Sequence, residues 1–363
     1  MRIEVLKIKD LIPFVESDLY KSFEELPITT LRAISQANNP RASADDPALL
    51  IALNDQNEIT SYIGFLPDKL QIGESTQKIF SNSCWWAKKD CNDNGAMQLF
   101  FLGCKLTNNQ LFFPDLTPHT KQLLGSMKAF TVREIDNGLC GYFKMDLANI
   151  LPAKRSYFSR FKSLLIVFDS LVNGAFKPLK WIWKLKTANT SLRYEIVDNI
   201  DDEIDGFILK NYKYELFKRT ETELNWILNY PWVTTKPTDN TKNYAFTYKL
   251  NSFKTIPVKV YNSAGFVAFF MLLEHDGKAH IPYFYCQPEI INDTLKVLYK
   301  LLLDKNIHTF TSFQSELNTV VRSNPHPFLH LRKRSKVIAF SKNLETEFDS
   351  KVLQDGDGDC AFI

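Results

Sequence analysis

One order of predicted elements occurs twice along the chain, and this repeat constrains the fold more than any other feature of the sequence. In the first copy, strand-like segments lead to a pair of tryptophans at 85–86, and a short loop then opens into an apolar helix over 96–105. In the second copy, a three-strand meander leads to an aromatic run at 283–285, ahead of a helix over 291–304. A strand that ends at a helix N-terminus can hold a phosphate, because free N–H groups and the helix dipole both point there. The pattern therefore indicates a nucleotide-type ligand, although neither loop has the repeated glycines of such sites.

Length and composition favour a two-domain globular chain. The 363 residues are too many for one ordinary core and correspond to two domains of roughly 150 residues each. No run of 18 apolar residues occurs, and Met1 opens an alternating strand pattern, so neither a membrane span nor a signal peptide is expected. The six cysteines form no CxxC pair. Buried thiols and a cytoplasmic location are therefore expected.

Hydrophobic periodicity and turn residues predict the same element order in both halves. In the first half, strands are predicted over 3–8, 48–53, 59–72, 78–87, 111–113 and 130–135, with helices over 96–105 and 118–128 and helical spacing over 18–39. In the second half, strands are predicted over 193–197, 254–261, 266–274, 279–286, 308–313 and 336–341, with helices over 201–211, 221–228, 291–304 and 315–321. The predicted domains are 1–150 and 190–344, separated by a linker over 151–189 and followed by an acidic tail over 345–363. The end of this tail, with its Asp-Gly-Asp-Gly-Asp sequence, is expected to be flexible or loosely docked.

The linker has the most unusual composition of any segment in the sequence. Between 154 and 186, eight Lys and Arg residues stand against the single acid Asp169, a net charge of +7, and seven aromatic side chains are interleaved. Such a segment can lie on an anionic membrane surface or meet a polyanion. The alternative is an interdomain helix whose apolar side packs on both domains while its lysines face water.

The repeated order, with a strand, two helices, a meander, a strand–loop–helix and a strand–helix–strand unit, resembles the GCN5-related N-acetyltransferase (GNAT) fold. The resemblance covers about 1–145 and 190–342. It implies an α+β fold class, with two tandem domains that are each a mixed, mostly antiparallel sheet flanked by helices. It also implies acyl transfer from an acyl-CoA to an amine. Tandem copies of this fold resemble Fem-type peptidyl transferases as well.

In that family, the loop after the fourth strand reads Gln/Arg-x-x-Gly-x-Gly/Ala and binds the coenzyme A pyrophosphate. The matching segment here is 92–97, in which Gly95 falls on the first glycine, Asn92 replaces the basic or amide residue and Met97 replaces the small residue. Gly125 falls where the family has its general-acid tyrosine. The resemblance implies an acyl-CoA site without a metal, formed by Trp86, Asn92, Asn94, Gly95, Ala96 and Met97.

The second domain departs further from the family pattern, because the loop after Cys286 contains no glycine. It offers a candidate acceptor cleft instead. Glu289 and Tyr285 are predicted to be catalytic, with Glu289 taking the ammonium proton, and Tyr283 and His280 are predicted to bind substrate. The alternative for Glu289 is a helix N-terminal charge that complements the dipole.

The favoured hypothesis is a cytoplasmic enzyme, peripheral to the membrane if the linker binds lipid, that moves an acyl group from acyl-CoA to a small amine acceptor. A sugar or cell-envelope precursor is the suggested acceptor. The first alternative is a non-catalytic GNAT-like binding module, which the missing glycines and tyrosine favour. The second is Fem-like aminoacyl transfer from a charged tRNA, with the linker on phosphates and steeply salt-dependent RNA binding. Nucleic acid is otherwise not an expected partner.

Overall fold

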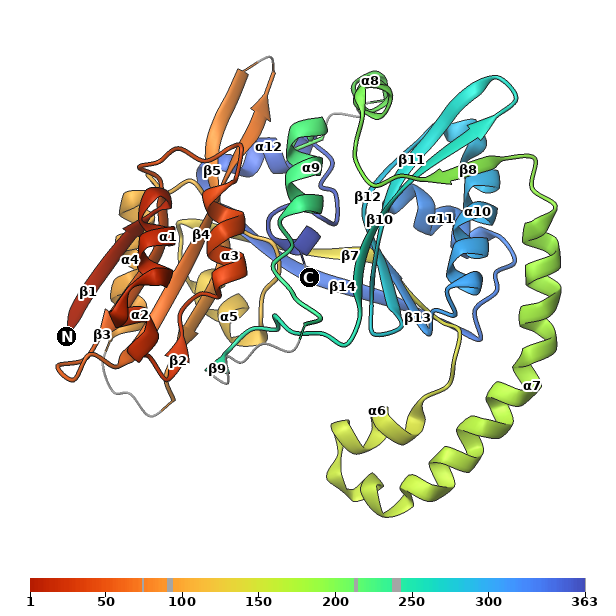
Figure 1. The fold of residues 1–363 in the computed structure, drawn as a ribbon, viewed down its shortest axis with the longest axis horizontal. Coiled ribbons are helices and arrows are strands. Elements are labelled where there is room, and N and C mark those ends of the chain that lie inside the picture. Colours follow the sequence, from red (N-terminus) through yellow and green to blue (C-terminus); the bar gives the residue numbers. More distant parts are fainter. Residues whose placement is uncertain (74, 90–93, 212–214, 237–242, 363) are drawn as a thin grey trace.

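A computed structural model describes residues 1–73, 75–89, 94–211, 215–236 and 243–362. A single twelve-stranded sheet runs through both halves of the molecule (Figure 1). Its strands, in spatial order, are β1 (Arg2–Lys7), β3 (Pro47–Leu53), β4 (Ile59–Ile72), β5 (Ser75–Ala87), β6 (Leu111–Phe113), β14 (His330–Ser341), β7 (Phe130–Tyr142), β13 (Thr309–Ser312), β12 (Lys278–Cys286), β11 (Gly265–His275), β10 (Phe253–Asn262) and β8 (Arg193–Ile196). A small second sheet pairs β2 (Glu25–Leu26) with β9 (Asn243–Tyr244).

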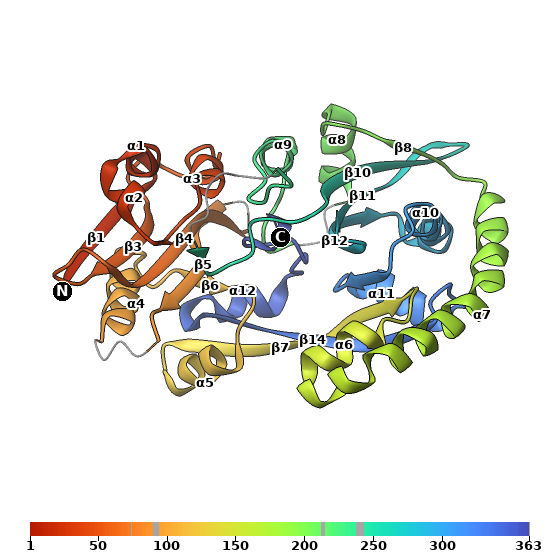
Figure 2. The same cartoon turned by 60° about the horizontal axis from the view of Figure 1, so that its bottom comes forward.

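Helices cover both faces of the large sheet (Figure 2). One face carries α1 (Leu11–Glu16), α2 (Asp18–Ser22), α3 (Thr30–Ala37), α8 (Asp202–Lys210) and α9 (Glu221–Asn229). The other carries α4 (Gly95–Leu106), α5 (Pro118–Ser126), α10 (Ile291–Asp304) and α11 (Ser315–Ser323). Local capping fixes several starts, since the side chains of Thr29, Thr117 and Asp201 each accept a first-turn N–H. The half with β1 and β3–β6 is called lobe one, and the half with β8 and β10–β13 is called lobe two.

The two lobes exchange strands at the middle of the sheet. β7 and β14 pair antiparallel along their length, from Phe130–Ser341 to Tyr142–His330. The end of β14 pairs with β6 of lobe one, whereas the end of β7 pairs with β13 of lobe two. The predicted closing strands over 130–135 and 336–341 are correct but too short. Their mutual pairing continues β7 beyond 135 to Tyr142 and begins β14 at His330, and the basic residues at 332–334 are exposed on β14.

The predicted fold class is confirmed, with 48–53, 59–72, 111–113 and 291–304 falling on observed elements within a residue or two. Two hydrophobic clusters join the lobes instead of belonging to one of them. One contains Leu66 of β4, Trp226 of α9, Phe269 of β11 and Phe362 from the end of the chain. The other packs Phe112 of β6 with Phe217, Phe340 and Phe348. The lobes are therefore held by shared apolar burial as well as by the sheet.

The expectation of a flexible acidic tail is wrong. After β14 and α12 (Glu345–Ser350), the chain returns to the centre of the molecule, and residues 354–362 are almost all buried between the lobes (Figure 2). Two glycines permit this close approach. A Cβ atom on Gly356 would lie 2.7 Å from Pro282 Cβ, and Gly358 has a φ of +76°, which favours glycine. The aspartates that suggested solvent exposure are paired with basic side chains inside.

Gly138 of β7 should be indispensable to the exchanged strands. A Cβ atom there would lie 2.4 Å from Phe313 Cε1 and 2.7 Å from the Arg334 carbonyl oxygen, so Gly138→Ala should lower the free energy of unfolding by about 1–3 kcal/mol. Urea denaturation measures this loss. In the control Gly174→Ala, no atom lies within 4 Å of the new Cβ, and the helix should be unchanged or stabilised by up to about 1 kcal/mol. Equal stabilities of the two variants would contradict the packing described here.

Candidate functional site

In each lobe, two parallel strands pair briefly and then separate in front of a helix. In lobe one, β5 and β6 pair only at Phe80–Leu111 and Ser81–Phe112, and β5 continues alone to Ala87 before α4 begins. In lobe two, the β12–β13 pairing ends at His280–Thr311, and β12 continues to Cys286 before α10. The repeat seen in the sequence thus places two equivalent strand openings in the sheet.

A β-bulge marks each opening. Gly64 of β4 pairs with Cys84 of β5, and Phe65 pairs with Asn82, so that Ser83 is an extra residue. In lobe two, Met271 pairs with Tyr283 and Leu273 with His280, which leaves residues 281–282 opposite Leu272 alone. Bulges kink a strand and redirect its polar groups, and they are common beside active sites.

The tail fills the opening in lobe two. The Gly356 N–H donates to the Pro282 carbonyl (2.8 Å), and the side-chain amide of Gln354 bridges the N–H and C=O of Phe284 (3.4 Å each). The Gln314 side chain donates to the carbonyls of Ile281 and Pro282 (3.3 and 3.2 Å). The chain itself therefore satisfies the backbone groups that β13 leaves unpaired.

In lobe one, a buried arginine and a tail carboxylate lie against the bulge. Arg32 of α3 donates to the Ser83 carbonyl and to Asp359 Oδ2 (3.1 Å), and its other terminal nitrogen donates to the Tyr244 hydroxyl (2.5 Å). Its guanidinium also stacks on Trp232 at 3.9 Å. Burial raises the pKa of Asp359 to about 6, with Arg32 acting in the opposite direction. A carboxyl group able to exchange a proton near neutral pH thus lies beside the lobe-one bulge.

A buried ion network connects the tail to both lobes. Asp68 of β4 binds Arg41 (2.7 Å) and Arg219 (2.8 Å), and Arg219 also binds Asp357 of the tail (3.1 Å). Burial tends to raise the pKa of Asp68, but Arg219 and Arg41 together hold it below its ordinary value. Burial raises the pKa of Asp357 to about 6, and the nearby Asp68 carboxylate adds to the rise.

A second buried group lies where the tail meets β12. Gln354 donates to Glu215 Oε1 (2.7 Å), and the Tyr285 hydroxyl donates to Glu215 Oε2 (3.2 Å). Burial raises the pKa of Glu215 to about 7, with the Asp357 carboxylate adding to the rise. These two donors are neutral, so each stabilises the carboxylate less than an arginine would.

The predicted lobe-two residues contact the tail. The Tyr283 hydroxyl donates to the Gly356 carbonyl (2.9 Å), and Tyr285 is buried against Glu215. His280 is half-buried beside Asp355 and Cys360, and burial lowers its pKa. Glu289 is exposed in the short 3-10 turn Pro288–Ile290. The structure thus brings Tyr283, Tyr285 and His280 to the tail, while Glu289 lies outside this group.

The predicted donor residues lie at the lobe-one opening. Trp86 stacks on Tyr62 with ring centroids 5.2 Å apart, and Asn94 precedes α4 without capping it through its side chain. Gly95 begins α4 and is buried, and Ala96 and Met97 are half-buried in its first turn. Asn92 lies outside the described residues. Sequence reasoning missed Arg32, Asp359 and the Asp68 network, although the Asp-Gly-Asp-Gly-Asp sequence was a signal for close-packed, paired carboxylates.

The stability of the protein should depend on pH through Glu215. Its folded pKa of about 7 exceeds its ordinary value of 4.5, so the folded state holds more protons between these pH values and stability falls as pH rises. Between pH 5 and pH 8 the wild type should lose up to about 3 kcal/mol of its free energy of unfolding through Glu215, and the variant Glu215→Gln should not show this loss. Urea denaturation at the two pH values measures it. Glu289→Gln, at an exposed carboxylate of the same lobe, is the control, and an unchanged pH dependence in Glu215→Gln would refute the assignment.

No protein-family model matches the sequence, and no curated protein is significantly similar to it. Solved structures do match its fold. A conserved Enterococcus faecalis protein of unknown function, described as a probable N-acyltransferase, has a TM-score of 0.51 at 11% identity, covering 96% of this chain and 74% of that chain. A GCN5-related N-acetyltransferase from Anabaena variabilis has a TM-score of 0.46 at 8% identity, covering 93% and 72%. Saccharomyces cerevisiae N-myristoyltransferase with bound myristoyl-CoA has a TM-score of 0.46 at 10% identity, covering 93% and 82%. At such identities the likeness is one of fold, and the chain has a GNAT-like fold whose two lobes share one sheet.

Proposed function

We propose that the protein is an N-acyltransferase that moves an acyl group from an acyl-CoA to an amine. The observation that carries this proposal is the strand opening of lobe one, where β5 separates from β6, bulges at Ser83 and leads to α4. Arg32 contacts both the Ser83 carbonyl and the Asp359 carboxyl group beside that bulge. An extended pantetheine arm carries amides that can pair with a strand edge in the manner of an added strand. A pyrophosphate is favoured at the N-terminal amides of α4, which no side chain of Asn94 caps.

We assign the donor to lobe one because the C-terminal tail already fills the equivalent opening of lobe two. The hydrogen bonds of Gly356 and Gln354 already occupy β12 there. The sequence after Cys286 also lacks a glycine that would let a phosphate approach the backbone. The buried Tyr283 and Tyr285 then serve to seat the tail.

The chemistry requires a neutral amine, a positioned thioester and a route for one proton. The amine nitrogen attacks the thioester carbonyl, a C–N bond replaces the C–S bond, and the thiolate leaves. Most of the acceleration would come from holding the two reactants together. Asp359, with a pKa of about 6, is ionised above neutral pH and can accept the ammonium proton. Its position beside the bulge supports giving Asp359, in this proposal, the role that the sequence suggested for Glu289.

The acceptor that we propose is a small amine, in the class of sugar or cell-envelope precursors. The Fem-like alternative, with an aminoacyl-tRNA as donor, requires RNA binding that weakens steeply with salt. A non-catalytic binding module is the remaining alternative. The two experiments below separate these possibilities, because the first measures donor binding and the second measures turnover.

Replacement of Gly95 by leucine should abolish acyl-CoA binding. Gly95 begins α4 and is buried, so a bulky side chain there would stand where the pyrophosphate meets the helix. Isothermal titration with acetyl-CoA, and then with longer acyl-CoAs, measures this. Gly206→Leu is the matched control, since Gly206 is a helical glycine with no atom within 4 Å of an added Cβ. Unchanged binding in Gly95→Leu would overturn the site, and no binding by the wild type would favour a non-catalytic module.

Replacement of Asp359 by asparagine should slow turnover while leaving acyl-CoA binding intact. A loss of about 10²–10⁴-fold is expected for a missing proton acceptor. In the wild type, turnover should rise with pH through about 6, and this rise should disappear in the variant. Asp357→Asn is the control, because it removes a neighbouring tail carboxyl group of similar pKa that faces Arg219 instead of the bulge. Loss of the pH dependence in Asp357→Asn alone would contradict the role of Asp359.

A further inference from the structure

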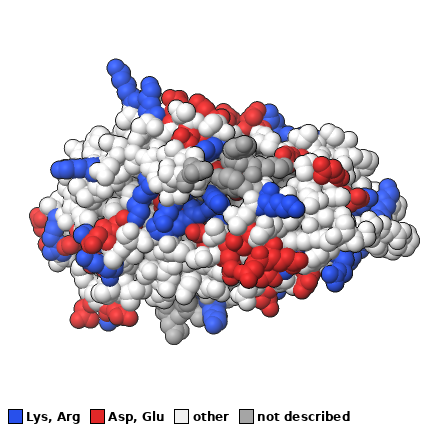
Figure 3. All heavy atoms as spheres, turned by 90° about the horizontal axis from the view of Figure 1, so that it is seen from above, with Lys and Arg blue, Asp and Glu red and all other residues white. Residues whose placement is uncertain are grey.

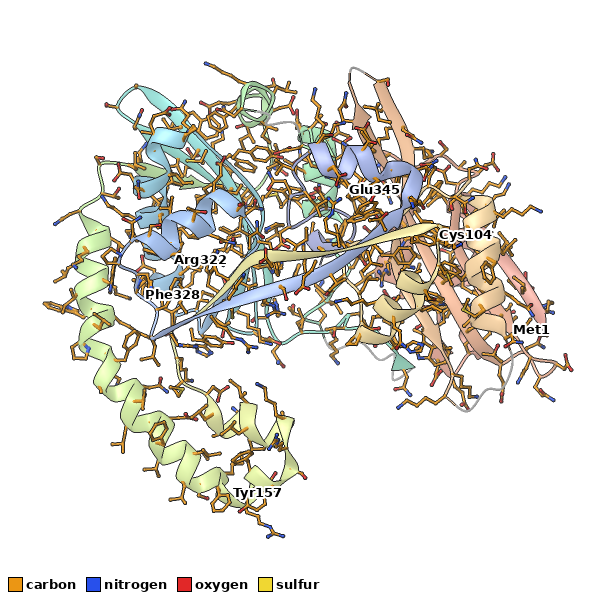
Figure 4. The ribbon with its side chains drawn as sticks, turned by 180° about the vertical axis from the view of Figure 1, so that it is seen from behind. Met1, Cys104, Tyr157, Arg322, Phe328 and Glu345 are labelled. Carbon is orange, nitrogen blue, oxygen red and sulfur yellow. The ribbon has the colours of Figure 1, made fainter. Side chains whose placement is uncertain are left out.

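Residues 147–188 form an arm that extends from the body of the protein. The arm contains α6 (Leu147–Lys154), the 3-10 segment Ser156–Phe161 and the long helix α7 (Lys162–Ala188). Figure 1 shows it curving below and to the right of the two lobes. Figure 4 shows Tyr157 at its far end, pointing away from the body. The arm corresponds to the basic linker of the sequence.

The inward face of α7 combines polar contacts with an aromatic contact to lobe two, where Trp183 meets Tyr299 edge-on with ring centroids 5.8 Å apart. Asp169 accepts hydrogen bonds from the N–H groups of Leu147 (3.1 Å) and Ala148 (2.8 Å), and so holds the start of α6. Asn173 accepts from the Met145 N–H (2.8 Å) and donates to the Met145 carbonyl (2.9 Å). Asp169, Phe176 and Thr187 are the buried residues of the helix, and they share one face by their spacing.

The outward face of α7 is apolar. Residues 164, 167, 171, 178, 182 and 185 recur at spacings that place them on one side of the helix, opposite the buried face. Leu164, Leu171 and Trp181 are 67%, 68% and 63% exposed. More than half of the exposed large apolar side chains in the described part of the chain lie between 157 and 185. The expected interdomain helix with its apolar side packed on both domains is therefore contradicted.

The charge of the arm complements an anionic surface. Its only acid between 154 and 186, Asp169, is buried, whereas Lys162 and Lys177 are exposed. With +7 on this segment and +3 on the whole chain, the remainder carries −4. Figure 3 shows acidic side chains gathered right of centre on the upper face. The helix α8, at the top of Figure 1, begins with Asp202, Glu203 and Asp205. In Figure 1, α7 runs down the right side of lobe two and joins α6 below the body.

We propose that the arm binds the surface of an anionic lipid bilayer, with the apolar face of α7 in the boundary between headgroups and acyl chains. A basic helix with an exposed apolar stripe and amphipathic aromatic side chains such as Trp181 has the chemistry for that position. No helix in the described ranges is long and apolar enough to cross a membrane, so the helix would lie in the plane of the surface. A second copy of the chain is a poorer occupant, because two segments of +7 would repel each other.

Vesicle sedimentation of the full chain tests the proposal. The protein should bind vesicles that contain about one third phosphatidylglycerol, bind pure phosphatidylcholine weakly, and dissociate as salt increases. The double variant Lys162→Gln/Lys177→Gln should bind about 30-fold more weakly. Leu171→Gln/Trp181→Gln should bind weakly to both kinds of vesicle. Leu209→Gln, at a 45% exposed leucine of α8, is the control and should bind as the wild type does.

Fluorescence quenching then locates the helix. Brominated lipids in anionic vesicles should quench part of the tryptophan emission of the wild type, and Trp181→Phe should remove that part. Quenching that persists unchanged in Trp181→Phe would contradict the proposed orientation, in which Trp181 of α7 lies in the bilayer. Absence of vesicle binding would overturn the proposal, as would a dimer, measured by light scattering, that Leu171→Gln dissociates.

Discussion

The antiparallel ladder between β7 and β14 is the interaction on which the rest of the structure depends. Each strand belongs by sequence to one half of the repeat and contributes hydrogen bonds to the other, so neither lobe has a complete sheet alone. β14 ends in lobe one, and the chain after it must cross the middle of the molecule to reach β12. The strand exchange therefore sets the position of the tail, and the tail carries Asp357 and Asp359 into the interior.

The two lobes use the same architectural opening in opposite ways. A bulge and a diverging parallel pair occur in both lobes, but they are bound differently. Residues 354–356 bind the edge of β12, whereas Arg32, itself paired with Asp359, donates to the Ser83 carbonyl at the bulge of β5. When a fold is duplicated, the opening of one copy can thus be filled by the chain itself, while the equivalent opening of the other copy stays accessible in our proposal. The buried network of Asp68, Arg41 and Arg219 is suited to this task, because Arg219 binds both Asp68 of lobe one and Asp357 of the tail.

Most helices and strands could be predicted from local patterns, since residues such as those of β4 and α10 alternate or recur at the spacing that their own element requires. The sequence-based predictions failed for residues whose interaction partner is not close in the sequence. Asp359 is buried where Arg32 binds it, although these two residues lie 327 positions apart in the sequence. The half-buried Lys336 likewise binds Asp355 of the tail at 2.6 Å. The donor side that we propose rests on Gly95 and the aromatic strand before it, which are visible in the local sequence. The carboxyl side required three-dimensional pairing that no local pattern contains.

The strand exchange also determines the order in which the protein can assemble during translation. Lobe one is synthesised first, yet the edge of β6 and the whole of β7 lack their partner until β14 has emerged, about 200 residues later. At translation rates of roughly 5–20 residues per second, this interval lasts on the order of 10–40 s. During it, the nascent chain would present an unpaired strand edge and the apolar surface that Phe340 and Phe348 later cover. A chaperone that shields β-strand edges on the ribosome would be expected to raise the yield of this protein more than that of a single-lobe relative.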